Sequence, residues 1–418
     1  MSKVVKIQKV VYGGHGLAKE DKVYFVPYTL PEEEVEIQVI EEKKDYSVAK
    51  PVKIVKPSVF RQEAPCKYYT VCGGCDFQHI LYEKQIEIKK EILKDQLLRI
   101  GKIDTEIKDV YPSNPFNYRN KAQFKFDGKN FGFYKHNSHE IVDVDYCYLL
   151  KEDLNQTIQP LKKFLLKYAL NVSQIVVFSN YKDEKLIKFE FTDDSQIVNV
   201  IPDLNIYKDE IDKKIKGVGF YSKNKRHLLL GEDVVFEVVD RYKYRVSMDS
   251  FFQVNIYQVK NLIDIVVSYV EGYKKVVDFY CGVGTLTIPI AFHVKDVLGI
   301  EANEEAVKDA KANVKHNNLK NLKFLKGKTD KGLKYAKDFK PDLIVLDPPR
   351  SGLNKKIVKE ISSIESVKRV VYVSCNPSTL ARDLKDFQES GFKVNKISMI
   401  DMFPQTHHIE SVSVLDKI

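Results

Sequence analysis

The sequence predicts an α/β protein whose C-terminal part is a Rossmann-like domain, preceded by a small OB-like β-barrel and a central α+β domain. From about residue 251 apolar strands alternate with helical stretches, beginning with KKVVDFYCGVGTLTIPIAFHV and VKDVLGIEANEEAVKDAKANVKHN. Such alternation builds a parallel sheet with helices on both faces. Residues 1 to about 57 instead hold short strand-like runs broken by GGHG and by Pro31, a density that favours a small barrel.

These patterns divide the chain into three domains, at residues 1–57, 58–250 and 251–418. A chain of 418 residues exceeds what one hydrophobic core normally serves. Near residues 80–101 apolar side chains recur at helical spacing and Gly101 closes the helix, and we expect this helix to pack on the C-terminal domain. The rest of the central region is expected to be mixed and mostly antiparallel, with β-rich runs such as KAQFKF, QIVVFSN and QIVNVI around one helix in LNQTIQPLKKFLLKYA.

Composition places the chain among soluble globular proteins, with 44% hydrophobic and 30% charged residues. No apolar run approaches the roughly 20 residues that span a bilayer, and the N-terminus lacks the apolar core of an export signal. We therefore expect a cytoplasmic protein with no membrane partner, and a monomer. The net charge of +9 permits a polyanionic partner such as RNA.

Four of the six cysteines are spaced as ligands of a metal centre. Cys66, Cys72 and Cys75 lie in CKYYTVCGGCDFQH, and Cys147 follows in DVDYCYLL. Paired spacings of this kind in a cytosolic chain indicate metal binding more than disulfides. An iron-sulfur cluster and a four-thiolate zinc site both fit the pattern.

The glycine turn after the first strand of the C-terminal domain indicates an adenosyl cofactor. Gly282 and Gly284 let the backbone approach a ligand, and Glu301 at the end of the next strand is placed to accept hydrogen bonds from ribose hydroxyls. A dinucleotide site needs a third glycine, which the run CGVGTLT lacks. S-adenosylmethionine, which has no phosphate, fits better, and PDLIVLDPPR two elements later places Asp347 at the same sheet edge.

A cysteine and a carboxylate complete the predicted chemistry. Cys375 follows the strand RVVYVS and precedes Asn376 and Pro377, while Glu410 enters a strand after DMFPQTHHI. Carbon 5 of a pyrimidine is a poor nucleophile until a thiolate adds to carbon 6, and a base must then remove the proton at carbon 5. Cys375 and Glu410 supply this pair. Arg350 would either stabilise the developing enolate oxygen or form a salt bridge within its own loop.

Together these segments resemble the RNA uridine carbon-5 methyltransferases, in the branch that has an N-terminal TRAM barrel and a four-iron four-sulfur cluster and modifies 23S ribosomal RNA. The resemblance covers essentially the whole chain and rests on the cysteine motif with Cys147, and on SFFQVN, DFYCGVGTLTIP, LDPPRSG, VSCNPSTLARD and DMFPQTHHIE. It implies cluster ligands, S-adenosylmethionine contacts and a catalytic pair. The implied cluster ligands are Cys66, Cys72, Cys75 and Cys147. The implied S-adenosylmethionine contacts are Gln253, Tyr280, Glu301 and Asp347. The implied catalytic pair is Cys375 as nucleophile and Glu410 as base.

The chain departs from the family pattern at Gln405, where many members have histidine, and in GKTDKGL, which lacks an acid that commonly holds the adenine amino group. Other functions remain open at this point. The substrate can be transfer RNA in place of ribosomal RNA, or the DPPR loop can serve an amino-group methyltransferase. A third alternative is a non-catalytic RNA-binding or iron-sulfur assembly protein.

Overall fold

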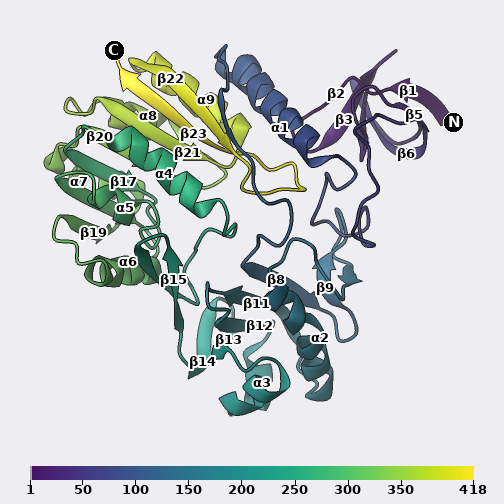
Figure 1. The fold of residues 1–418 in the computed structure, drawn as a ribbon, viewed down its shortest axis with the longest axis horizontal. Helices are drawn as coiled ribbons and strands as arrows, with labels where there is room; N and C mark the ends of the chain where they lie inside the picture. Colours follow the sequence, from purple (N-terminus) through teal and green to yellow (C-terminus); the bar gives the residue numbers. More distant parts are fainter. Residues whose placement is uncertain (1) are drawn as a thin grey trace.

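The computed structural model describes residues 2–418, without the side chains of Ser2, Val198 and Asn199. Three sheets form three parts of the molecule, and Figure 1 shows the N-terminal sheet beside helix α1, the C-terminal sheet with its helices, and the central sheet below both. Within the described residues no helix is long and apolar enough to cross a membrane.

The N-terminal sheet has six strands in the order β1-β5-β6-β4-β3-β2. Its two outer strands are separated in sequence only by Ile7 and Gln8, whose backbone N–H groups donate to Glu33 and Leu17 at 2.9 and 2.8 Å. The sheet is therefore curved into a half-barrel, which confirms the β-rich N-terminal region. The strands are β1 (Ser2–Lys6), β2 (Lys9–Val10), β3 (His15–Lys19), β4 (Val23–Pro27), β5 (Glu34–Glu42) and β6 (Tyr46–Lys56).

The central sheet is antiparallel except for the pair β12–β13, as the sequence predicted. Helix α2 (Glu152–Lys167) buries its apolar side chains against this sheet, and α3 (Leu204–Glu210) lies at its far end (Figure 1). The strand order is β10-β9-β8-β11-β12-β13-β14. The strands are β8 (Lys121–Phe126), β9 (Phe131–Tyr134), β10 (Ile141–Asp143), β11 (Val172–Ser179), β12 (Lys185–Phe191), β13 (Ile215–Ser222) and β14 (Lys225–Gly231).

The predicted strand QIVNVI is wrong, because this segment lies in a 3-10 helix at Asp194–Asn199. The Asp193 carboxylate accepts a hydrogen bond from the Ser195 backbone N–H at 2.9 Å and starts the turn. Both edges of the preceding strand β12 are already paired, with β11 and β13. An apolar run with no free strand edge beside it cannot join the sheet.

The C-terminal sheet confirms the α/β fold. Its eight strands follow the order β19-β18-β17-β20-β21-β23-β22-β7; the first five are parallel and β23 runs antiparallel between its neighbours. The strands are β17 (Lys275–Phe279), β18 (Asp296–Glu301), β19 (Leu322–Lys326), β20 (Leu343–Leu346), β21 (Arg369–Ser374), β22 (Phe392–Ile400), β23 (Glu410–Lys417) and β7 (Asp109–Tyr111).

Helices cover both faces of this sheet and bury two apolar cores against it. One face carries α7 (Thr329–Phe339), α8 (Lys355–Ser362), α9 (Pro377–Glu389) and α1 (Tyr82–Gln96), which continues into a π-helical turn at Leu97–Gly101. The other face carries α4 (Val259–Val270), α5 (Thr287–Ala291) and α6 (Glu304–His316), together with the hairpin β15 (Val234–Val239) and β16 (Tyr242–Ser247). Helix α1, strand β7 and this hairpin thus pack with the C-terminal sheet although they precede residue 251.

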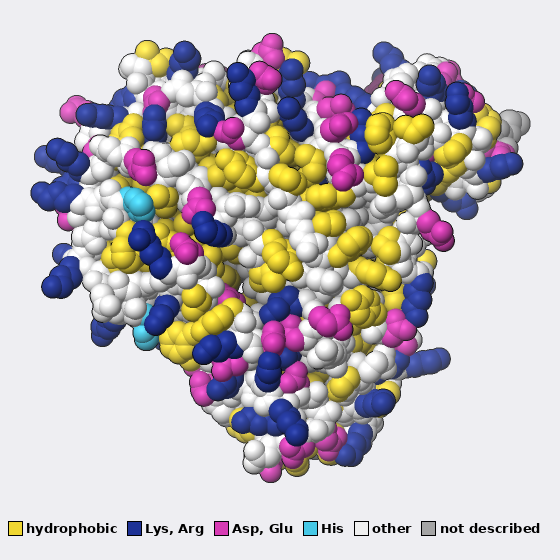
Figure 2. Space-filling model, viewed as in Figure 1, with side chains coloured by type: hydrophobic (Ala, Val, Ile, Leu, Met, Phe, Trp, Pro, Cys, Tyr) yellow, Lys and Arg dark blue, Asp and Glu magenta, His cyan; other side chains and the backbone are white. Residues whose placement is uncertain are grey.

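The surface carries mixed charge. On the face shown in Figure 2, Lys and Arg side chains alternate with Asp and Glu over all three parts, and hydrophobic side chains gather where the parts meet. The excess positive charge is thus spread over this face, and a basic patch does not by itself mark a binding surface there.

Candidate active site

One cavity of about 910 Å³ lies between the cysteine loop, the central sheet and the C-terminal sheet, and every site residue predicted from the sequence lines it. These residues come from segments far apart in the chain and are brought together only by the fold. They are Cys66, Cys72, Cys75, Cys147, Gln253, Tyr280, Glu301, Asp347, Cys375 and Glu410.

The glycine turn between β17 and α5 is held in a strained conformation. Tyr280 has a φ of +63°, in the left-handed region that residues other than glycine rarely adopt. Its backbone N–H donates to the Ile300 carbonyl of the neighbouring strand at 2.9 Å, which fixes the turn. Gly282 and Gly284 follow with φ of +54° and +89°. A β-carbon on Gly282 would meet open space, whereas one on Gly284 would lie 2.9 Å from the Phe324 ring.

The Glu301 carboxylate joins the glycine turn to the next loop. One oxygen accepts from the Gly282 backbone N–H at 3.0 Å and the other from the Asn303 N–H at 2.7 Å. Each carboxylate oxygen has two acceptor sites, so Glu301 can still accept from a ligand. Asn303 also lines the cavity and caps helix α6 through the Ala306 N–H at 3.0 Å. The sequence reading missed Asn303, although an asparagine before a helical run is a capping signal.

Buried carboxyl groups surround this part of the cavity. Burial raises the pKa of Asp347 to about 7. Burial also raises the pKa of Asp278 to about 8, and the charges of Asp347 and Glu301 raise this pKa further. The hydrogen bond that the Thr287 hydroxyl donates to Asp278 at 2.5 Å opposes the rise. The other oxygen of Asp278 has no hydrogen-bond partner within the described residues. Carboxyl groups that repel each other in this way favour a positively charged ligand.

Cys375 is presented at the start of a capped helix. Strand β21 ends at Ser374, and the Asn376 side chain accepts from the backbone N–H groups of Ser378 and Thr379 at 3.0 and 3.4 Å. The Asn376 amide also donates to the Arg350 carbonyl at 3.0 Å. The cap therefore ties the cysteine turn to the DPPR loop, so that the thiol and Arg350 lie on the same cavity wall.

The thiol of Cys375 is protonated at neutral pH in the free protein. Burial raises its pKa to about 11, the charges of Glu410 and Asp347 add to the rise, and the charge of Arg350 lowers it. Glu410 lies at the start of β23 and is 5% exposed. Burial holds the pKa of Glu410 well above its usual range, Asp347 raises it further and Arg350 opposes the rise. The charge of Arg350 thus acts on both the Cys375 thiol and the Glu410 carboxyl group.

Arg350 is exposed and contacts the His408 ring at 3.4 Å through Nη2. In the part of the chain that the structure describes, it has no carboxylate partner. The salt bridge within its own loop is therefore not present, and its charge is free to act on the cavity.

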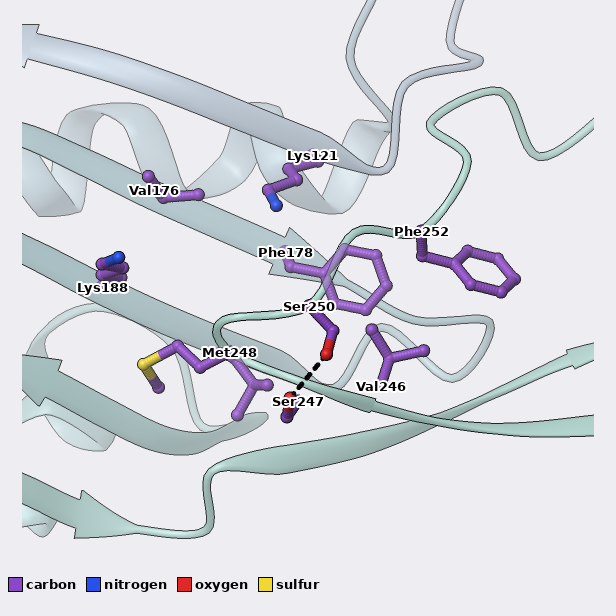
Figure 3. Close-up of a pocket in the computed structure, with 10 residues that line it drawn as sticks. Lys121, Val176, Phe178, Lys188, Val246, Ser247, Met248, Ser250 and Phe252 are labelled. Carbon is purple, nitrogen blue, oxygen red and sulfur yellow. Dashed lines mark hydrogen bonds between the residues drawn. The ribbon is translucent and has the colours of Figure 1, made fainter. Parts of the chain in front are cut away.

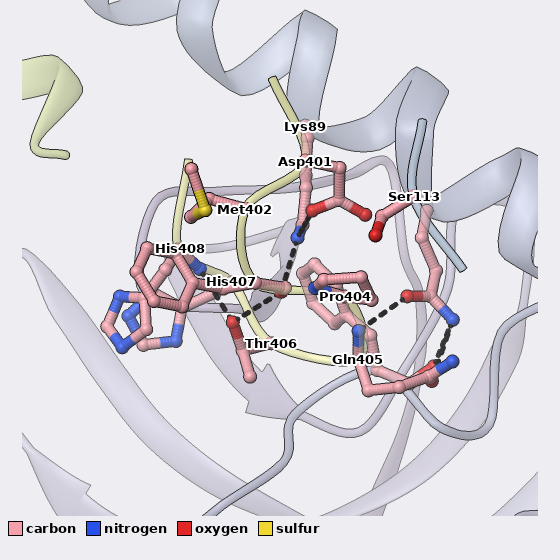
Figure 4. A network of polar contacts seen from close by, with 12 residues as sticks. Lys89, Ser113, Asp401, Met402, Pro404, Gln405, Thr406, His407 and His408 are labelled. Carbon is pink, nitrogen blue, oxygen red and sulfur yellow. Dashed lines mark hydrogen bonds and ion pairs between the residues drawn. The ribbon is translucent and has the colours of Figure 1, made fainter. Parts of the chain in front are cut away.

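The loop Asp401–His408 that precedes Glu410 is held by buried polar contacts, which Figure 4 shows. The Lys89 amine of α1 pairs with Asp401 at 2.6 Å and donates to the Phe403 carbonyl at 2.9 Å. The Tyr118 hydroxyl donates to the Pro404 carbonyl at 3.0 Å. Position 405, where the resemblance implied a histidine in many family members, holds a buried glutamine with a φ of +67°.

The four predicted cluster ligands lie at the other end of the cavity. Burial raises the pKa of the Cys147 thiol to about 11 and holds that of Cys75 well above the usual range, and nearby thiols raise both further. The Gln78 amide donates to the Cys75 sulfur at 3.2 Å, and the Asn155 side chain accepts from the Cys147 N–H at 2.8 Å. No disulfide links them.

Among the described residues, no group of three or more His, Cys, Asp or Glu side chains is arranged to hold a metal ion. A single Zn²⁺ needs its sulfurs about 2.3 Å from one point. A four-iron cluster is held by four thiolates on a larger framework. The four sulfurs thus do not form a metal-binding group among the described residues.

A second, much smaller pocket lies between the central sheet and the hairpin β15–β16. Its volume of about 10 Å³ admits about one water molecule. Figure 3 shows Lys121 and Lys188 on one side of it and the hydrogen-bonded pair Ser247 and Ser250 on the other. The pocket is too small for a cofactor or a nucleotide, so the large cavity is the candidate active site.

The fold and the cavity define a class: a Rossmann-like methyltransferase in which a glycine turn and an acidic strand end face a cysteine and a buried glutamate. The family model described as tRNA (Uracil-5-)-methyltransferase matches residues 81–418, and the chain belongs to this family. It is an RNA (uracil-5-)-methyltransferase that uses S-adenosylmethionine. The family predicted from the sequence motifs is thereby confirmed at this level.

Similar proteins cover nearly the whole chain. An uncharacterized RNA methyltransferase of Aquifex aeolicus is 38% identical over 98% of this chain and 97% of its own length. An uncharacterized RNA methyltransferase of Thermotoga maritima is 34% identical over 100% of this chain and 99% of its own length. Among solved structures, the tRNA (uracil-54, C5)-methyltransferase of Pyrococcus abyssi, in complex with S-adenosyl-L-homocysteine, is 27% identical, has a TM-score of 0.78, and covers 99% of this chain and 100% of its own.

Proposed function

We propose that this protein methylates carbon 5 of a uridine in 23S ribosomal RNA, with Cys375 as the nucleophile and Glu410 as the general base. The observation that carries the proposal is the shared cavity. Cys375 and Glu410 line the same space as Gly282, Glu301 and Asp347, so a flipped base and a methyl donor can meet between them.

The role of Cys375 follows from its position at the N-terminus of α9. Its thiolate adds to carbon 6 of the uracil ring, forming a carbon–sulfur bond and moving an electron pair onto the carbonyl oxygen at carbon 4 as an enolate. The helix N-terminus and the Arg350 charge both favour the thiolate, against burial and the charges of Glu410 and Asp347. The Arg350 guanidinium is also the cation available to stabilise the enolate oxygen.

The role of Glu410 is to remove the proton from carbon 5. As the proton leaves, the electron pair of the carbon–hydrogen bond re-forms the ring double bond and expels the Cys375 thiolate. A carboxyl group whose pKa is raised by burial holds the proton well once it has taken it. The contacts of Asp401–His408 fix the loop that delivers Glu410 to the cavity.

Gln253, Tyr280, Glu301 and Asp347 are proposed to hold S-adenosylmethionine, which when bound supplies the methyl group. Their fit to this cofactor rests on charge and shape. The buried carboxyl groups around the glycine turn favour a ligand that carries positive charge, and the open space above Gly282 lets a ligand contact the backbone. Glu301 accepts from ribose hydroxyls with the acceptor sites that its two backbone contacts leave free.

We further propose that Cys66, Cys72, Cys75 and Cys147 hold a four-iron four-sulfur cluster. In support, the four thiols line one end of the cavity and form no disulfides. The charge of one thiol also raises the pKa of another within the group. Gln78 and Asn155 supply the hydrogen bonds that commonly orient ligands and their backbone. The cluster would join the cysteine loop to the central sheet.

The half-barrel is proposed to be a TRAM barrel that helps to bind RNA. Ribosomal RNA is the substrate that the resemblance of the sequence motifs implies. Transfer RNA is the second candidate, since the solved relative from Pyrococcus abyssi is a tRNA enzyme and covers 99% of this chain. Amino-group methylation needs neither a nucleophilic cysteine nor its base, and Cys375 and Glu410 argue against it.

Covalent trapping tests this proposal. Transcripts of 23S ribosomal RNA and of transfer RNA that carry 5-fluorouridine are incubated with protein and S-adenosylmethionine, and the adducts are resolved by denaturing electrophoresis. We expect an adduct with ribosomal RNA for the wild type and for Cys281→Ala, whose thiol is buried in a core, and none for Cys375→Ala. On normal RNA, Glu410→Gln should accumulate methylated RNA attached to protein. Methylation by Cys375→Ala would overturn the mechanism, and an adduct only with transfer RNA would overturn the substrate.

A further inference from the structure

The N-terminal half-barrel is fixed against the catalytic part of the molecule. Val10 and Leu30 of the half-barrel are buried in the same apolar core as α1 and α9. The Lys9 amine pairs with Asp95 of α1 at 2.8 Å. Figure 1 shows β2 and β3 next to α1. The turn that follows β2 therefore has a defined position relative to the catalytic residues.

This turn packs closely against the loop that leads to Glu410. Gly14 is buried with a φ of +82°, and a β-carbon there would lie 3.2 Å from the His407 β-carbon and 3.3 Å from that of Asp76. Asp76 in turn pairs with the His407 ring at 2.7 Å. Only glycine allows this close approach, so the half-barrel meets the catalytic loop at His407.

Tyr12 lies at this meeting point, and two histidine rings link it to Arg350. Its ring packs edge-on against the His407 ring with centroids 6.0 Å apart, the His407 and His408 rings are 4.3 Å apart, and His408 contacts Arg350 at 3.4 Å. Tyr12 also feels the charges of both Arg350 and Cys375: burial raises the pKa of its phenol, Arg350 lowers it and Cys375 raises it.

The Tyr12 hydroxyl is a donor without a partner in the described part of the chain. Within the described residues it forms no hydrogen bond, and Arg350 has no carboxylate partner. An exposed cation and a hydroxyl donor that are linked through His407 and His408 suit an anionic oxygen, since Arg and Tyr both donate to such groups. The half-buried Tyr12 ring thus carries a hydroxyl without a partner in the described residues, two histidine rings away from Arg350.

We propose that Tyr12, supplied by the half-barrel, contacts the target nucleotide and donates a hydrogen bond to an anionic oxygen that Arg350 also binds. This rests on the proposed function, because it assumes that the uridine meets Cys375. The half-barrel would then contribute a residue to the active site in addition to binding RNA at a distance. The oxygen is either a phosphodiester oxygen of that nucleotide or the enolate oxygen that appears after Cys375 adds.

The test compares Tyr12→Phe with Tyr24→Phe. Both changes remove one hydroxyl from the half-barrel, but Tyr24 is buried there and bonds Asp21 at 3.1 Å. The probe is whichever transcript the wild type methylates. A hydrogen bond to a charged group is worth enough to expect a loss of about tenfold or more for Tyr12→Phe and no comparable loss for Tyr24→Phe. Unchanged melting temperature and S-adenosylhomocysteine affinity check the fold of each variant.

The phosphate oxygen and the enolate oxygen predict different losses in the Tyr12→Phe variant. If the oxygen belongs to the phosphate, the Kd for RNA rises and kcat is kept. If it is the enolate, the Kd is kept, and kcat and the rate of adduct formation on 5-fluorouridine RNA fall together. The wild type must first form the adduct. If Tyr12→Phe then has the same Kd, kcat and adduct rate as the wild type, this inference alone is overturned. Absence of the adduct in the wild type would instead overturn the proposed function.

Discussion

Gln85 and Gln405 exchange hydrogen bonds across the joint between helix α1 and the loop that leads to Glu410. The Gln85 amide donates to the Gln405 side-chain oxygen at 2.9 Å, and the Gln405 backbone N–H donates to the Gln85 side-chain oxygen at 3.1 Å. Gln85 also donates to the Phe77 and Ile80 carbonyls at 3.1 and 2.9 Å. Gln405 thus helps to hold the loop that leads to Glu410 against helix α1.

The same joint contains a buried ion pair, and its loss should destabilise the protein. Lys89→Met leaves the Asp401 carboxylate buried without its cation, which costs about 3–5 kcal/mol of unfolding free energy. Lys94→Met, on an exposed position of the same helix, is the control and should change little. Urea unfolding measures both. Equal midpoints for the two variants would show that the pair contributes nothing to stability.

The reactivity of Cys375 should rise steeply with pH. Its pKa of about 11 leaves only a small thiolate fraction at neutral pH, and that fraction grows about tenfold per pH unit below the pKa. Alkylation by iodoacetamide between pH 7 and 9, followed by peptide mass mapping, measures it. Arg350→Gln should slow alkylation because Arg350 lowers the pKa, and Glu410→Gln should speed it because Glu410 raises the pKa. A rate that does not change between pH 7 and 9 would contradict the raised pKa.

The two glycines of the cofactor turn should respond differently to alanine. Gly282→Ala places a methyl group in open space and should cost about 1 kcal/mol for the left-handed backbone, yet weaken binding of S-adenosylhomocysteine. Gly284→Ala should destabilise more, because its β-carbon would lie 2.9 Å from Phe324. Gly128→Ala, at a φ of +91° with no atom within 4 Å, is the control for backbone strain. Calorimetry and thermal melts separate the effects, and unchanged affinity in Gly282→Ala would argue that the turn does not touch the cofactor.

The cysteine group should hold iron. Protein purified without oxygen is expected to be brown and to contain about four irons per chain, and Cys147→Ser should lose iron and melt at a lower temperature. Cys281→Ser changes a buried thiol outside the cavity and should keep its iron. Iron and zinc are measured by elemental analysis. One zinc per chain with no iron would favour the four-thiolate zinc site instead.

The sequence by itself determined the fold class of the C-terminal part, its family and the residues to consider as a site. Strands that are buried on both faces are apolar throughout, and the glycine turn, Glu301, Asp347 and Cys375 each follow such a strand, so local pattern alone put them at one sheet edge. The run QIVNVI shows the limit of this reasoning. A short apolar run is compatible with more than one structure, and the occupied edges of β12 decided against a strand.

Tertiary structure alone decided what surrounds these residues. Strand β7 joins the C-terminal sheet from a distant part of the sequence, and the Gln85–Gln405 and Lys89–Asp401 contacts join residues more than three hundred positions apart. The pKa of Cys375 depends on Glu410, Asp347 and Arg350 around it, and Tyr12 packs against His407 only because the half-barrel docks on α1. Sequence periodicity reports which side chains are buried within one element; it carries no information on which elements meet, because that depends on packing between surfaces far apart in the chain.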